Sequence, residues 1–198
     1  MGKICFINGQ PYMVSLPTGG KHKNDHNSQW DDLINFLGED CNDIFHWKDM
    51  CTWCQEKVIQ NAPVIRGYFS ARLWRNYSAS FRYVSLGFRP VLTPLDADTL
   101  KPDPSLLEDI PDGRVFALAS LYMNGKVIKN PTNPTDKGNV SDYMEGATLI
   151  LGNRDSDPAN WIYVIKHGDL LWVDRNILKS ISWDDLKGQG FVSEEEPV

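Results

Sequence analysis

The chain has 198 residues, of which 41% are hydrophobic and 23% are charged, a composition typical of a globular protein of one domain or two small ones. No apolar run approaches the length of about 20 residues that a bilayer-spanning helix requires. The formal net charge of −6 argues against a general nucleic-acid binder, because such proteins are usually basic.

The first segments of the chain predict a strand and then helices. MGKICFINGQPYMVSLPTGG, residues 1–20, contains a short strand pattern that ends at a Pro/Gly turn, and it lacks the long apolar run of a signal peptide. We therefore expect a cytoplasmic location without membrane attachment. SQWDDLINFLGEDC predicts a helix with Ser28 as the N-cap and Gly38 as the stop. WKDMCTWCQEKV, residues 47–58, predicts a second helix.

The pattern changes at residues 93–113, TPLDADTLKPDPSLLEDIPDG, which hold four prolines and six acidic residues. Such a segment is typical of a solvated linker. The sequence thus predicts a first domain over 1–95, a linker over 96–113 and a second, acidic domain over 114–198. Few apolar residues in the linker are available to join two cores, so we expect the halves to fold separately.

The second half has a β-rich pattern. RVFALASLYMNGKVI predicts a hairpin that turns at Asn124-Gly125, and NWIYVIKHGDLLWV predicts another that turns near His167-Gly168. GATLILGN predicts a further strand, residues 129–142 a long loop, and SISWDDL a helix with Ser182 as its N-cap. Five short strands and one helix suggest a small barrel or sandwich closed by a C-terminal helix, and the whole chain is predicted to be α+β.

The segment RGYFSARLWRNYSASFRYVSLGFRPVL, Arg66 to Leu92, holds five arginines, seven aromatic residues and no acid. Aromatic faces stack on bases and guanidinium groups hold phosphates, so this arginine–aromatic strip could bind a single-stranded nucleic acid. The alternative is structural. YVSLGFRPVL alternates as a strand does, and the buried face of a strand consumes such residues.

These residues resemble a known fold. RGYFSARLW and LGFRPVL, with LPTGG at 16–20 and DIFHWKDMCTWCQEK at 43–57, resemble the C-type-lectin-like fold of formylglycine-generating-enzyme relatives and retroelement-diversified variable proteins. The match is to a variant found in phage and gut-bacterial proteins, and it covers about residues 10–92. It implies a C-type-lectin-like N-terminal domain in which Gly87, Phe88 and Arg89 are structural. The oxidase members use a copper-binding cysteine pair near the domain end, which residues 55–198 lack.

The resemblance also implies an exposed ligand face just before the GFR strand. Large aromatic residues and arginine dominate binding energy at interfaces, which suits this role. The candidate ligand- or partner-binding residues are Tyr68, Arg72, Trp74, Arg75, Asn76, Tyr77, Ser78, Ser80, Arg82 and Tyr83.

The cysteines leave two interpretations open. Cys51-x2-Cys54 is half of a zinc pattern that Cys41, His46 or Cys5 could complete. Alternatively, the thiols are buried and reduced, which we favour because the predicted helix would place the pair on a buried face. The sequence contains no P-loop, G-x-S-x-G, H-E-x-x-H or dinucleotide fingerprint, so we expect no cofactor and no metal.

The leading functional hypothesis is a non-catalytic, phage-borne protein that binds a host protein or a protein–nucleic-acid complex. An inhibitor of a bacterial defence system, such as a CRISPR effector, is one such role, since surplus acid in the second half would imitate phosphate in a basic groove. One alternative is a metal-dependent nuclease that uses Asp174, Asp184 and Asp185 to hold Mg²⁺, although such acids commonly cap helices. Another is a lectin-like binder of small ligands.

Overall fold

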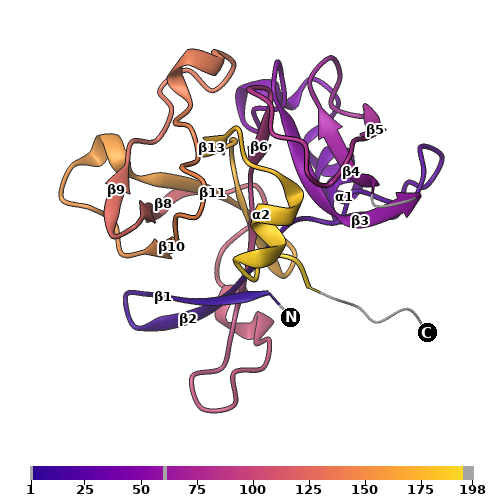
Figure 1. Ribbon diagram of the computed structural model, residues 1–198. Helices are drawn as coiled ribbons and strands as arrows, with labels where there is room; N and C mark the ends of the chain where they lie inside the picture. The colour runs from indigo at the N-terminus through magenta and orange to yellow at the C-terminus, as the bar shows by residue number, and fades with distance from the viewer. Residues whose placement is uncertain (1, 60–61, 194–198) are drawn as a thin grey trace.

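The computed structural model describes residues 2–59 and 62–193 (Figure 1). Within these ranges the fold is mostly β, with two α-helices, α1 (Gln29–Leu37) and α2 (Trp183–Gly188). Short 3-10 turns are η1 (Cys41–Asp43), η2 (Pro104–Leu107), η3 (Lys137–Asn139) and η4 (Pro158–Asn160). The strands are β1 (Lys3–Ile7), β2 (Gln10–Ser15), β3 (Cys51–Ile59), β4 (Ala62–Gly67), β5 (Trp74–Asn76), β6 (Leu86–Phe88), β7 (Val91–Pro94), β8 (Val115–Met123), β9 (Lys126–Ile128), β10 (Leu149–Gly152), β11 (Ile162–His167), β12 (Leu170–Val173) and β13 (Leu178–Lys179).

The strands form two sheets. The larger has the order β1-β2-β7-β12-β11-β8-β10, with β9 paired to β8, and it curls so that β1 and β10 at its two ends come into contact. Between these two end strands, Lys3 Nζ donates a hydrogen bond to the Leu149 carbonyl at 2.6 Å. The smaller sheet has the order β13-β6-β3-β4-β5. In the view of Figure 1, β3–β5 and α1 lie on one side of the molecule and β8–β10 on the other, with α2 between them.

Local signals in the sequence are confirmed where they rest on caps and turns. Ser28 Oγ accepts a hydrogen bond from Asp31 N at the start of α1, and Gly38, at φ 93°, ends it. Asn124 and Gly125 join β8 to β9 with positive φ angles of 52° and 78°, the conformation of a type I′ hairpin turn. Ser182 and Asp185 form a capping box at the start of α2.

The predicted helix over residues 47–58 is wrong, because Cys51–Ile59 form the central strand β3 of the small sheet. Residues 51–54 are four consecutive buried residues, and Trp53 Nε1 donates to the Ile181 carbonyl at 2.8 Å. A strand covered on both faces reads as a continuous apolar run and loses the alternation that would identify it.

The predicted strand through YVSLGFRPVL is divided into two. β6 belongs to the small sheet, where it pairs with β3 and β13, and β7 belongs to the large sheet between β2 and β12. The chain crosses from one sheet to the other at Arg89 and Pro90. Tyr83 and Val84 lie outside both strands and are exposed.

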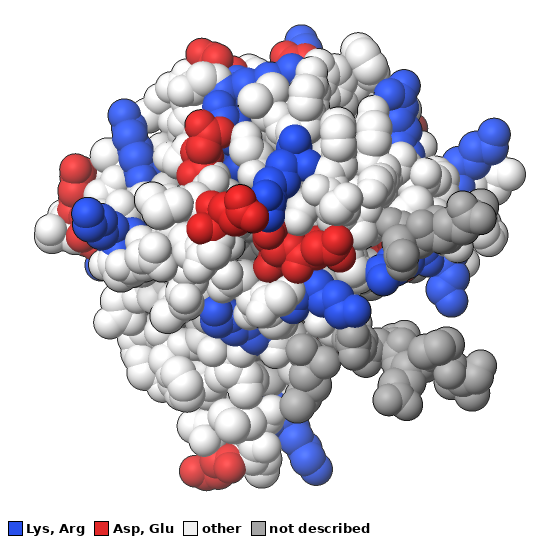
Figure 2. Space-filling model, viewed as in Figure 1, with Lys and Arg blue, Asp and Glu red and all other residues white. Residues whose placement is uncertain are grey.

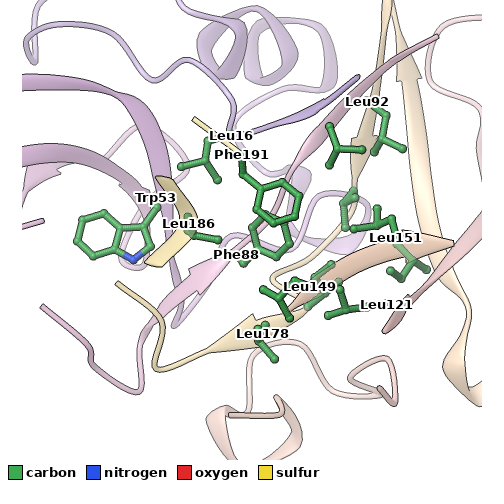
Figure 3. Packing of buried hydrophobic residues seen from close by; sticks show 14 of the residues in the cluster. Leu16, Trp53, Phe88, Leu92, Leu121, Leu149, Leu151, Leu178, Leu186 and Phe191 are labelled. Atoms are coloured by element: carbon green, nitrogen blue, oxygen red, sulfur yellow. The ribbon is translucent and has the colours of Figure 1, made fainter. Parts of the chain in front are cut away.

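Residues of both halves of the chain pack in one core cluster, whereas the sequence predicts separate domains over 1–95 and 114–198. Figure 3 shows Phe88 and Leu92 from the first half packed in one cluster with Leu121, Leu149 and Phe191 from the second. The rings of Phe88 and Phe191 lie 4.7 Å apart. The β-rich second half likewise completes its curled sheet with β1, β2 and β7, so it is not closed by its own strands.

Within residues 2–59 and 62–193, no helix is both long and apolar enough to cross a membrane.

Candidate functional site

The middle of the arginine–aromatic strip lines a pocket of about 460 Å³ on one face of the small sheet. We call it the aromatic pocket. Leu86 pairs with Cys51 across β6 and β3, and Ile65 pairs with Arg75 across β4 and β5, so these residues share one face of the sheet. The other lining residues follow β4 or precede β6, and are Tyr68, Phe69, Leu73, Tyr77, Phe81, Tyr83 and Ser85.

The walls of the aromatic pocket are exposed rings. The exposed fractions are 40% for Tyr77, 41% for Phe81, 53% for Tyr83 and 70% for Phe69. Tyr77, Phe81 and Tyr83 form a near-parallel stack: adjacent centroids lie 5.5 and 5.7 Å apart, with interplanar angles of 13° and 17°. Tyr68 and Phe69 meet edge to face at 4.6 Å. Because large rings exposed together leave apolar surface in water, this arrangement is typical of a binding site.

The charged groups at the aromatic pocket are cations. None of its lining residues is Asp or Glu, and Arg75 lies on the lining with its guanidinium 5.9 Å from the centroid of Phe69. Lys137, from η3, places its Nζ 3.2 Å from the Tyr68 hydroxyl and 5.0 Å from the centroid of that ring. Burial raises the pKa of Cys51 to about 12, while the positive charges of Arg75 and Lys137 act in the opposite direction. Arg75 therefore lies on the lining of the pocket, and Lys137 lies beside it, against the lining residue Tyr68.

The candidate binding residues divide into two groups in the structure. Tyr68, Arg75, Tyr77 and Tyr83 line the aromatic pocket, and Asn76 is exposed on the edge strand β5. The others contact the protein itself. Arg72 Nε donates to Glu39 Oε1 at 2.6 Å, Trp74 Nε1 to the Gly20 carbonyl at 3.2 Å, Arg82 to both carboxylate oxygens of Asp185 at 2.7 Å, and Ser78 Oγ lies 3.1 Å from Ser80 Oγ.

Sequence reasoning missed Phe69, Phe81 and Lys137. The two phenylalanines carry a usable signal, since each is a large aromatic residue of the strip that lies outside any predicted strand. Lys137 carries none, because it reaches the strip from the 129–142 loop, far along the chain.

The ends of the strip are structural, as predicted for Gly87, Phe88 and Arg89. A Cβ on Gly87 would lie 2.7 Å from the side chain of Asn176, so only glycine fits there. Arg89 is fully buried and donates to the carbonyls of Asp174 and His46, with its guanidinium 4.0 Å from the centroid of Phe45. Burial lowers the pKa of Arg89 to about 9, which leaves it protonated at neutral pH.

The cysteines are all buried and free, as the preferred interpretation requires. Cys51 and Cys54 do not share a helical face. They are three residues apart on strand β3, which directs their side chains to opposite faces of the sheet. Among the described residues, no group of three or more His, Cys, Asp or Glu could hold a metal ion.

The carboxylates of the nuclease alternative are held by neighbouring groups or lie apart. Asp174 accepts two hydrogen bonds of 2.9 Å from Arg175, and His46 Nε2 lies 3.9 Å from it beside a second, smaller pocket. Asp185 accepts from Arg82 and caps α2, and Asp184 is exposed in the first turn of that helix.

A comparison of this chain with family models, curated proteins and solved structures finds no match. Functional inference for this protein therefore rests on the geometry of the aromatic pocket. On the face drawn in Figure 2, acidic and basic side chains lie close to one another, and the basic ones do not form a continuous track.

Proposed function

We propose that this protein is a non-catalytic binding protein whose ligand or partner enters the aromatic pocket. The observation that carries the proposal is the exposed stack of Tyr77, Phe81 and Tyr83 beside a concave surface. These rings find only part of their contact area within the protein. A partner group that enters the pocket would remove the remainder from water, at about 25 cal/mol for each Å² of apolar surface.

The partner that we propose is the one expected from the sequence, a host protein or a protein–nucleic-acid complex. A phage-borne inhibitor of a bacterial defence system is the role we infer from the phage-like LPTGG and DIFHWKDMCTWCQEK segments. A C-type-lectin-like fold for the N-terminal part belongs to the same proposal and rests on that resemblance alone. The lectin-like binder of small ligands is the second candidate, which the volume of about 460 Å³ favours because it lies in the usual range for small-molecule pockets.

The test is affinity capture from a host lysate with three immobilised forms of the protein. One is the natural sequence, one carries Tyr77→Ala and Tyr83→Ala, and the third carries Phe6→Ala as a matched control. Phe6 is a 60% exposed ring on β1 that does not line the pocket. We expect partners to be lost from the pocket variant and kept by the control. Equal capture by all three forms would show that the pocket is not the binding site.

A further inference from the structure

The chemistry of the aromatic pocket narrows the class of its ligand, an inference that rests on the proposed function. Among the described residues, Arg75 is the one arginine of the strip with no hydrogen bond or ion pair to the protein. Arg66 pairs with Asp31, Arg72 with Glu39 and Arg82 with Asp185, while Arg89 donates to two carbonyls. The guanidinium of Arg75 therefore has its donors available at the pocket.

A second cation, Lys137, contacts the lining residue Tyr68. The Nζ of Lys137 makes one hydrogen bond, to the Tyr68 hydroxyl, and an ammonium has three donors. No carboxylate on the lining neutralises either cation. A ligand with about two negative charges on one group would satisfy both, which fits a phosphate monoester better than a carboxylate.

The rings specify the other part of the ligand. Tyr77, Phe81 and Tyr83 are stacked nearly parallel, and the residues at the two ends of the stack, Tyr77 and Tyr83, are 40% and 53% exposed. A planar ring extends such a stack with full face contact, as bases do on aromatic side chains of proteins that bind single strands. An aliphatic group would use only part of that surface.

The charge of the whole molecule limits the size of the ligand. The net charge is −6, and Arg82, which lies between the lining residues Phe81 and Tyr83 in sequence, forms ion pairs with Glu145 and Asp185. A long polyanion would be repelled by the net negative charge of the protein, and the face in Figure 2 shows no continuous basic track for it. A single nucleotide unit avoids this repulsion.

We infer that the aromatic pocket binds a nucleobase joined to a phosphate, with the base on the ring stack and the phosphate between Arg75 and Lys137. Two sources supply this chemistry: a free nucleoside monophosphate, and the phosphorylated end of a single strand.

The experiment is calorimetric titration of the full chain with adenosine 5′-monophosphate, adenosine and inorganic phosphate. We expect the nucleotide to bind more tightly than either part. Arg75→Ala and Tyr83→Ala should each weaken it about fivefold or more, the lower end for loss of one stacking contact. Arg75→Lys should restore part of the loss. A 5′-phosphorylated tetradeoxyadenylate separates the sources: tighter binding than the mononucleotide indicates a strand end, and equal or weaker binding a free nucleotide.

The control variants are Arg154→Ala and Phe6→Ala. Arg154 is an exposed arginine whose guanidinium lies 4.5 Å from the centroid of Trp161, and it does not line the pocket. Arg154→Ala therefore removes the same kind of side chain as Arg75→Ala, at a position outside the pocket. Both controls should stay within twofold of the natural protein. Equal weakening by Arg75→Ala and Arg154→Ala would overturn the assignment.

A peptide that carries phenylalanine beside aspartate tests the competing ligand class. If that peptide binds and the nucleotide does not, the nucleotide assignment is wrong while the pocket stays a binding site. If neither binds but lysate capture still depends on Tyr83, the nucleotide assignment again fails alone. If capture is also insensitive to Tyr83, the proposed function fails with it.

Discussion

Arg89→Ala should destabilise the protein by about 2–4 kcal/mol. The substitution removes the Arg89 donors to the carbonyls of His46 and Asp174. The Asp174 carbonyl keeps its hydrogen bond from His46 N, so the His46 carbonyl is the stranded acceptor, at a cost of about 1–3 kcal/mol. It also opens a cavity against Phe45 and Trp30, which lie under the guanidinium. The same substitution also removes a buried charge to which no carboxylate is bonded. The desolvation cost of that charge is then no longer incurred, which offsets the loss of stability by several kcal/mol at most.

The assay is urea unfolding followed by tryptophan fluorescence and far-ultraviolet circular dichroism. Arg75→Ala is the matched control, because it removes the same side chain from an exposed position and should change the free energy of unfolding by no more than about 0.5 kcal/mol. Arg89→Lys should recover little, since one ammonium lacks the planar fork that reaches both carbonyls. If Arg89→Ala and Arg75→Ala unfold at the same urea concentration, the hydrogen bonds of the Arg89 guanidinium to the two carbonyls do not stabilise the fold.

Three further predictions concern the fold. Burial raises the pKa of Glu56 against the hydrogen bonds from Gly19 and Gly20, so the folded state holds its proton at a pH where the unfolded state has lost it. The free energy of unfolding should therefore rise relative to Glu56→Gln as the pH falls from neutral toward the ordinary carboxyl range, and a pH-independent difference would contradict this. Proteolytic cleavage within residues 102–111, followed by separation of the pieces under denaturing conditions, should leave two fragments that do not refold alone, because β7 pairs with β12 across the cut; two fragments with native-like circular dichroism would refute it. A thiol reagent should label the four buried cysteines slowly in the native protein and rapidly in urea, since burial keeps them as thiols and out of solvent; fast native labelling would show that the core opens.

The sequence by itself determined the features that depend on neighbouring residues. Ser28 and Ser182 cap their helices through contacts within three residues, and Asn124-Gly125 turns because both residues tolerate positive φ. The structural role of Arg89 was implied by the resemblance of LGFRPVL to a known fold; the strand pattern alone did not give it, because Arg89 lies between β6 and β7.

The tertiary structure decided the strand β3, the shared core and the aromatic pocket. Cys51 pairs with Gly67 and with Leu86, so the strand owes its hydrogen bonds to residues that local pattern cannot see. The rings at 69, 77, 81 and 83 were visible as residue types, but which of them would converge depended on how β5 and the 77–85 segment fold over the small sheet. The same holds for Lys137, because a cation brought from a distant loop is placed by the packing of the whole chain.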